Sequence, residues 1–183
     1  MACFSPLTKQ GIKMLKLPKV AIQGDTGSYS EEAALSMLGQ EIEIHHCDHF
    51  REVFEMTKAG QTDCCVIPIE NSLAGSIHKN YDLLLKYKLE ITQEVNLHIQ
   101  HNLVGFPGVT FEEVSTVVSH PVALDQCENF FEKFPRLTRK SAYDTSGSVR
   151  RVVEESRRDW AAIASQRAAK HYGGQVLLTD IQD

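Results

Sequence analysis

The sequence of 183 residues contains no apolar run that approaches the ~20 residues of a membrane-spanning helix. Its first residues also lack the apolar stretch of a secretory signal. Its five cysteines form no Cys-X-X-Cys pair, which argues against a zinc ribbon, and their odd number argues against a disulfide framework. We therefore expect no membrane span, no metal centre and cysteines that remain reduced.

An excess of positive charge is also missing, because the formal net charge is −5. Residues 1–19 carry four lysines and no acidic residue, so the rest of the chain has a net charge of −9. Proteins bind nucleic acids through clustered lysines and arginines, so this acidic body argues against a nucleic-acid partner. Neither the Gly-X-Gly-X-X-Gly pattern of dinucleotide-binding folds nor a phosphate-binding P-loop occurs, and we expect no cofactor.

What the chain does contain is a regular alternation of short apolar runs with helical patterns. Strands are predicted at residues 19–23, 42–44, 64–67, 91–97, 103–104, 116–118, 137–143, 161–164 and 176–178. Helices are predicted at residues 30–38, 50–57, 77–87, 123–134 and 166–172, with another starting at Ser148. This alternation is typical of an α/β fold with mostly parallel sheets.

The pattern runs through two cycles, which predicts two lobes with a cleft between them. We expect the chain to cross between the lobes near residues 97–100 and again near 174–176. The first lobe then comprises residues 20–97 with 176–183, and the second comprises 98–175. Residues 1–19 are predicted to be a flexible basic lead-in.

Four polar loops follow predicted strands and precede predicted helices. They are Gly24–Ser30, Glu70–Ser76, Ser119–Pro121 and Asp144–Ser148. Such loops place backbone N–H groups and small hydroxyls at helix N-termini, where negative charge is stabilised. Ligands of α/β sheets bind beyond the carboxyl ends of the strands. The sequence therefore predicts binding of a small carboxylate.

The same segments resemble motifs of the prephenate dehydratase family, in the same order along residues 20–183. They are Gln23–Ser30, Val66–Ser72, Ser119–Pro121 with Gln126-Cys127, Asp144–Ser148 and Ala162–Ser165. The resemblance implies the two-lobed fold of type-II periplasmic binding proteins, with the active site in the cleft. It also implies cofactor-free decarboxylating dehydration of prephenate to phenylpyruvate, a step of phenylalanine biosynthesis.

The resemblance assigns catalytic roles to Asn71, Ser119 and Gln126. It assigns substrate binding to Ser28, Ser72, Thr145, Ser146 and Gly147. From the residue types alone, an asparagine after a strand ties a turn, and serine or threonine before a helix caps it. Those structural roles remain open alternatives at each of these positions.

The family also carries a Thr-Arg-Phe motif a few residues beyond the stretch that matches residues 181–183, and many members continue into a phenylalanine-binding ACT domain. Neither is found in these 183 residues. The chain is therefore interpreted as a piece of a longer enzyme or as a non-catalytic relative that binds small carboxylates. Arogenate dehydratase, which shares the motifs, is the alternative activity. The resemblance implies a homodimer or homotetramer in the cytoplasm, or in the plastid of a plant or alga.

The run His45-His46-Cys47-Asp48-His49 suggests a metal site. However, neighbouring residues of a strand point to opposite faces, so His45 and His46 are not expected to bind one ion. We expect a strand end here, followed by a helix that Asp48 caps.

Overall fold

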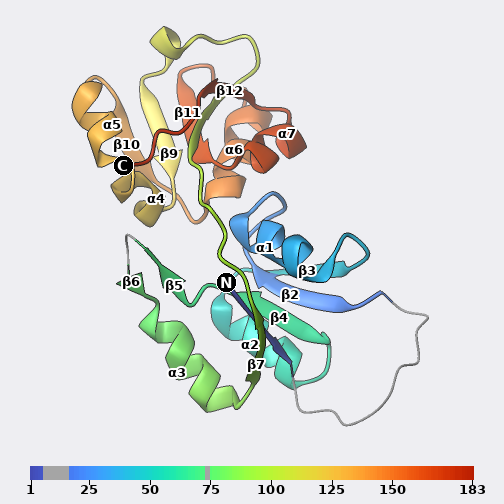
Figure 1. The fold of residues 1–183 in the computed structure, drawn as a ribbon. Helices are drawn as coiled ribbons and strands as arrows, with labels where there is room; N and C mark the ends of the chain where they lie inside the picture. Colours follow the sequence, from blue (N-terminus) through green and yellow to red (C-terminus); the bar gives the residue numbers. More distant parts are fainter. Residues whose placement is uncertain (6–16, 73–74) are drawn as a thin grey trace. The chain divides into compact units, whose positions relative to one another are not determined.

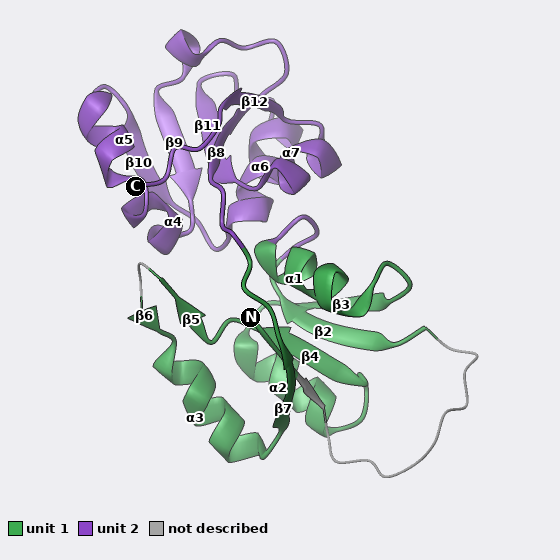
Figure 2. Cartoon of the chain, in the orientation of Figure 1, with its two compact units in different colours: residues 1–24, 29–97 green, residues 25–28, 98–183 purple. Residues whose placement is uncertain are grey.

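A computed structural model of the chain describes residues 1–5, 17–72 and 75–183 (Figure 1). These residues form two compact units, which comprise residues 1–24 with 29–97 and residues 25–28 with 98–183 (Figure 2). The chain passes from unit 1 to unit 2 between Leu97 and His98. Lys9, Lys13 and Lys16 of the predicted lead-in, and Leu73 and Ala74 of the second polar loop, lie outside the described residues.

Unit 1 is built on a five-stranded sheet with the order β3-β2-β4-β1-β7. Its strands are β1 (Ala2–Ser5), β2 (Lys19–Gln23), β3 (Glu43–Cys47), β4 (Cys64–Ile67) and β7 (Glu90–Glu94). Its helices are α1 (Tyr29–Leu38), α2 (Phe50–Lys58) and α3 (His78–Tyr87). A small hairpin of β5 (Glu70–Asn71) and β6 (Gly75–Ser76) follows β4. All strands of the main sheet run in one direction except β1, which is antiparallel to both its neighbours.

Strand β4 is apolar along its whole length because helices cover both faces of the sheet. On one face, Cys64 and Val66 pack with the alanines of α1. On the other face, Cys65 and Ile67 pack with Phe54 of α2. Cys64 and Cys65 thus lie on opposite faces and do not form a vicinal thiol pair.

Unit 2 repeats this topology in its own sheet, which has the order β10-β9-β11-β8-β12. Its strands are β8 (Asn102–Gly105), β9 (Thr116–Ser119), β10 (Thr138–Ser141), β11 (Trp160–Ala164) and β12 (Gln175–Leu178). Its helices are α4 (Pro121–Asp125), α5 (Glu128–Lys133), α6 (Thr145–Glu154) and α7 (Gln166–Tyr172), with the short 3-10 helix η1 (Phe111–Glu113). Here β8 is the strand that runs against the others. The two sheets confirm the predicted α/β fold.

Two apolar cores flank the sheet of unit 2. Val117, Ala161 and Ile163 face one core, which is filled by the phenylalanines of α5. Ala162 and Ala164 face the other, which is filled from α6 and α7. Successive side chains of β11 point to opposite faces of the sheet, and each face is covered by a core. All five residues of β11 are therefore buried.

The predicted return of residues 176–183 to the first lobe is wrong. Strand β12 (Gln175–Leu178) pairs antiparallel with β8, and Ile181 is buried in the core of unit 2. An apolar run of this length specifies a strand but not the sheet that it joins, because that choice depends on pairing partners distant in sequence. Residues 25–28, which follow β2, also belong to unit 2.

Three further details differ from the sequence-based predictions. Ala2–Ser5 is a strand between β4 and β7 and not part of a flexible lead-in. The helix predicted over 123–134 is two helices, which separate at Gln126 and Cys127. The residue at the N-cap of α2 is His49 and not Asp48, and the Glu52 carboxylate accepts from the N–H groups of both.

Within the described ranges, no helix is both long enough and apolar enough to cross a bilayer.

Candidate active site

Three polar loops of unit 2 lie at one edge of its sheet. Strands β9, β10 and β11 are adjacent and parallel, so their carboxyl ends share that edge. Ser119 ends β9, Asp144 follows β10 and Ser165 follows β11, and each leads into a helix. Two of the four polar loops singled out in the sequence, Ser119–Pro121 and Asp144–Ser148, therefore lie at the same sheet edge, together with the loop at Ser165.

The N-terminus of α6 is capped by its own Asp144. The N–H of Gly147 donates to Oδ1 of Asp144 (3.0 Å), and the N–H of Asp25 approaches Oδ2 (3.4 Å). The Asp25 carboxylate forms an ion pair with Arg150 (3.1 Å). A Cβ on Gly147 would crowd Oδ1 of Asp144 and lie 3.1 Å from Oδ2 of Asp25, so a side chain here would displace the Asp144 cap. Two carboxylates therefore already occupy the start of this helix.

Serine hydroxyls at the starts of α6 and α7 hold residues 25–28 by donating to their backbone carbonyls. Ser146 donates its hydroxyl to the carbonyl of Thr26, and Ser165 donates to the carbonyl of Gly27 (2.7 Å). Gly27 has φ +85°, and a Cβ there would lie 2.7 Å from Cα of Ala168. These contacts hold the segment that ends in Ser28 within unit 2, next to the starts of α6 and α7.

Several of the buried serine hydroxyls in this region donate to backbone carbonyls. Ser119 is fully buried and donates to Ile163 of the neighbouring strand (2.7 Å). Ser146 and Ser165 donate as described above, and Ser148 donates to Asp144 (2.6 Å). A hydroxyl that donates to a carbonyl can still accept a hydrogen bond from a ligand, but its hydrogen is already in use. Ser119 and Ser146 therefore hold the scaffold together in this structure.

Gln126 is the predicted site residue with the most specific side-chain contact. It lies at the C-cap of α4, and its Oε1 is 2.9 Å from Nε2 of His101. His101 is 2% exposed, and burial lowers its pKa, so the imidazole is neutral at pH 7. Sequence reasoning missed this contact, because the two residues are 25 positions apart and no local pattern links them.

Asn71 and Ser72 belong to unit 1. Asn71 lies in the β5–β6 hairpin, where it pairs with Gly75, and Ser72 is exposed. Asn80, which sequence reasoning missed, is fully buried and donates to the carbonyl of Pro68 (2.8 Å). It thereby holds the connection between β4 and the hairpin that carries Asn71.

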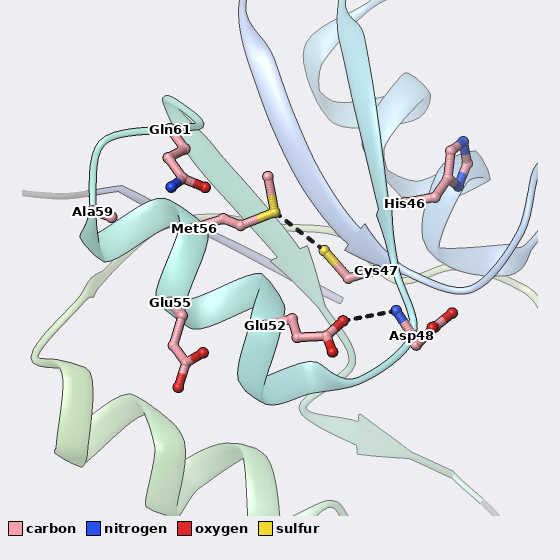
Figure 3. A pocket seen from close by; sticks show the side chains of 8 residues that line it. All are labelled: His46, Cys47, Asp48, Glu52, Glu55, Met56, Ala59 and Gln61. Atoms are coloured by element: carbon pink, nitrogen blue, oxygen red, sulfur yellow. Dashed lines mark hydrogen bonds between the residues drawn. The ribbon is translucent and has the colours of Figure 1, made fainter.

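A pocket of about 450 Å³ in unit 1 contains none of the predicted site residues. Figure 3 shows its lining, which includes the carboxylates of Asp48, Glu52 and Glu55 and the sulfur atoms of Cys47 and Met56. Burial, together with nearby Glu52 and Asp48, raises the pKa of Cys47 to about 11, so the thiol stays protonated. An acidic lining disfavours a carboxylate ligand.

His45 and His46 have separate partners, as expected for neighbours on a strand. Nε2 of His45 lies 3.0 Å from the Glu43 carboxylate, and Nδ1 of His46 lies 2.8 Å from the carbonyl of Gly24. Among residues 1–5, 17–72 and 75–183, no group of three or more His, Cys, Asp or Glu side chains is arranged to hold a metal ion.

Comparison with known proteins agrees with the order of the motifs. The family model for prephenate dehydratase matches residues 20–183. The chain belongs to the prephenate dehydratase family. It is 45% identical over 165 residues to arogenate dehydratase/prephenate dehydratase 2, chloroplastic, of Arabidopsis thaliana. The matched stretch covers 90% of this chain and 43% of that protein. The chain thus spans less than half the length of this relative.

Two solved structures share the fold of this prephenate dehydratase family member. The prephenate dehydratase of Arthrobacter aurescens in complex with L-Phe superposes with a TM-score of 0.83 at 26% identity, over 90% of this chain and 56% of that one. GqqA, described as a novel type of quorum quenching acylase, superposes with a TM-score of 0.79 at 28% identity, over 90% of this chain and 60% of that one.

The Asp144 cap predicts how stability depends on pH. Burial raises the pKa of Asp144 above its ordinary 3.8, although the N–H groups of Gly147 and Asp25 partly oppose this. The folded chain therefore binds the Asp144 proton more tightly than the unfolded chain does. The contribution of Asp144 to stability is highest below 3.8 and falls as the pH rises through its folded pKa.

An asparagine in place of Asp144 could still accept from the N–H of Gly147 but could not ionise. We expect Asp144→Asn to become progressively more stable relative to the wild type as the pH is raised from about 3 to about 7. Urea unfolding of both proteins across that range measures the difference. A difference that does not change with pH would contradict the effect of burial on this carboxyl.

Proposed function

We propose that this chain supplies the catalytic domain for the decarboxylating dehydration of prephenate to phenylpyruvate. The observation that carries the proposal is the family match over residues 20–183, the range in which all of the predicted site residues lie. The protein is then a carbon–oxygen lyase of phenylalanine biosynthesis.

The reaction makes modest chemical demands. Loss of the ring carboxylate as carbon dioxide supplies the electrons, the 4-hydroxyl leaves as water, and formation of the aromatic ring drives the step. An enzyme must orient a dicarboxylate and donate a hydrogen bond or proton to the departing hydroxyl. Neutral donors, held rigidly where charge develops, can provide this stabilisation.

Amide side chains are the donors that the described residues support best for this role. The Oε1 end of Gln126 faces His101, so the NH2 group is the end that His101 does not hold. Asn71 supplies a second amide, on the hairpin that follows β4. Ser119 and Ser146 already donate to carbonyls, so we propose that they support the site and act there only as hydrogen-bond acceptors. Ser28, Ser72 and Thr145 remain the proposed carboxylate contacts. The N–H of Gly147 already donates to Asp144, so we assign Gly147 the support of this loop.

Arogenate is the second candidate substrate. It differs from prephenate by an ammonium group in place of a keto group, and the Arabidopsis relative is named for both activities. A relative from Petunia hybrida, 44% identical over 166 residues, is named arogenate dehydratase 1 and is likewise covered only in part (39%). Measuring both substrates with the same preparation decides which is preferred.

Acyl transfer, suggested by the likeness to GqqA, is less well supported. It requires a hydroxyl or thiol nucleophile activated by a base. The Ser119 and Ser146 hydroxyls donate to backbone carbonyls and not to a histidine. Burial raises the pKa of Cys127, next to Gln126, to about 12, so its thiol is not a nucleophile at neutral pH.

The direct test is phenylpyruvate release from prephenate at neutral pH by the full-length protein that contains this chain, against an enzyme-free blank. We expect release well above the blank. Asn71→Ala and Gln126→Ala should each lower kcat by about 100-fold, the usual effect of removing one preorganised donor.

Asn96→Ala and Gln40→Ala are the matched controls, because both side chains are exposed and neither is part of a predicted site. They should retain the wild-type rate. Full activity in Asn71→Ala and Gln126→Ala would remove these two residues from the mechanism. A rate equal to the blank in the wild type would overturn the proposed reaction.

The family resemblance also supports a homodimer or homotetramer as the working assembly. The name of the Arabidopsis relative specifies the chloroplast, which favours the plastid as the compartment of this chain over the cytoplasm.

A further inference from the structure

Gln126 lies where three segments of unit 2 meet. Its side chain contacts His101, which precedes β8, and its backbone carbonyl accepts from the N–H of Asp183 (2.9 Å). Its own segment is the short break between α4 and α5. The N–H of Gln126 closes the last turn of α4 by donating to the carbonyl of Val122 (3.0 Å), whereas its side chain and its carbonyl are held by these contacts from outside the helix.

The contact with His101 fixes which end of the Gln126 amide is presented. A buried neutral imidazole carries one N–H, and an amide oxygen can only accept. With Oε1 of Gln126 2.9 Å from Nε2 of His101, the imidazole must be the Nε2–H tautomer and the donor in this bond. The NH2 group of Gln126 is then directed away from His101.

Residues 181–183 hold both partners of this contact. The N–H of Ile181 donates to the carbonyl of His101 (3.0 Å), and the N–H of His101 donates to Oε1 of Gln182 (2.8 Å). The His101 backbone is therefore bonded in both directions to one short segment. Ile181 anchors that segment in the apolar core.

Asp183 holds the other side of the break. Its carboxylate accepts from the N–H groups of Glu128 (3.1 Å) and Asn129 (3.0 Å) at the start of α5. The side chain of Cys127, the residue at the N-cap of this helix, makes no capping hydrogen bond. Asp183 therefore performs the capping role that the local sequence lacks.

We propose that His101 and Asp183 are positioning residues that fix the Gln126 amide with its NH2 group toward the reacting hydroxyl or carboxylate. This inference rests on the proposed function, because it gives Gln126 the role of a hydrogen-bond donor in that reaction. It gives a functional reason for the contact between the Gln126 amide and the buried His101. It also assigns residues 181–183 to the support of the site.

The test uses the full-length protein and four variants. His101→Phe keeps an aromatic ring but removes the donor, and it should lower kcat for prephenate about 10- to 100-fold with a smaller change in KM. His101→Gln places an amide nitrogen near the position of Nε2 and should recover most of the lost rate. His98→Phe makes the same change at an exposed histidine three residues away and should be neutral. Asp183→Ala should lower kcat in the same way as His101→Phe.

A double-mutant cycle separates positioning from general destabilisation. If His101 acts through Gln126, His101→Phe should cause no further loss of kcat in a Gln126→Ala background. A loss of the same size in both backgrounds would overturn the proposal. So would a full wild-type kcat in His101→Phe.

A measurement that does not depend on activity keeps this inference distinct from the proposed function. In full-length protein labelled with 15N-glutamine, the Gln126 side-chain NH2 signals are identified by their loss in Gln126→Ala. They should shift in His101→Phe and stay in place in His98→Phe. Unshifted signals in His101→Phe would overturn the positioning role even in an active enzyme, whereas shifted signals in an inactive protein would refute only the reaction.

Discussion

Gly27→Ala is expected to destabilise unit 2 by about 2–5 kcal/mol. Gly27 has φ +85°, a left-handed conformation that costs an L-residue about 1–2 kcal/mol. In addition, the new Cβ would lie 2.7 Å from Cα and 3.0 Å from N of Ala168. These are backbone atoms that cannot rotate away, so we add about 1–3 kcal/mol for overpacking. The clash would also separate Gly27 from Ser165, which donates to its carbonyl (2.7 Å).

Trp160 makes this prediction simple to measure. It is the single tryptophan of the chain and is buried in β11 of unit 2, so its fluorescence during urea unfolding follows this unit. Gly108→Ala is the matched control, because Gly108 has φ +80° but no atom within 4 Å of a Cβ. The difference between the two variants measures the clash alone. Equal unfolding free energies for both would show that residues 25–28 do not pack on α7 as described.

The elements that the sequence predicted well are those whose signal is local. The apolar runs at residues 64–67 and 161–164 indicated the central strands, because burial on both faces requires apolar side chains at every position. The polar loops after β9 and β10 followed from the helix starts. Their convergence at one sheet edge then follows from parallel strands alone.

The features that the sequence did not predict all depend on partners distant along the chain. Strand β12 was assigned to the wrong lobe because nothing within Gln175–Leu178 identifies β8 as its partner. The roles of His101 and Asn80 were missed for the same reason, since the groups they hold lie 25 and 12 residues away. The cap at Asp144 was also missed, because the helix was predicted to start at Ser148 whereas α6 starts at Thr145. The raised pKa of Asp144 comes from burial that a linear pattern does not reveal.

Phe54→Ala is expected to destabilise unit 1 by about 3–5 kcal/mol, the usual cost of removing a fully buried phenylalanine ring. Phe54 lies on α2, stacks on Tyr87 of α3 with ring centroids 5.8 Å apart, and belongs to the core that contains Ile67. The lost ring therefore leaves a cavity beneath the end of β4. That strand leads directly into the hairpin that carries Asn71, so the loss should spread to this candidate catalytic residue.

Hydrogen exchange of the full-length protein tests both parts of this last prediction. The amides of β4 and of the β5–β6 hairpin should exchange faster in Phe54→Ala, because local opening becomes less costly when fewer apolar contacts must be broken. Phe54→Leu keeps part of the volume and should show a smaller effect in the same segments. Faster exchange in β4 without a change in the hairpin would mean that Asn80, through its bond to Pro68, holds the Asn71 segment independently of the core.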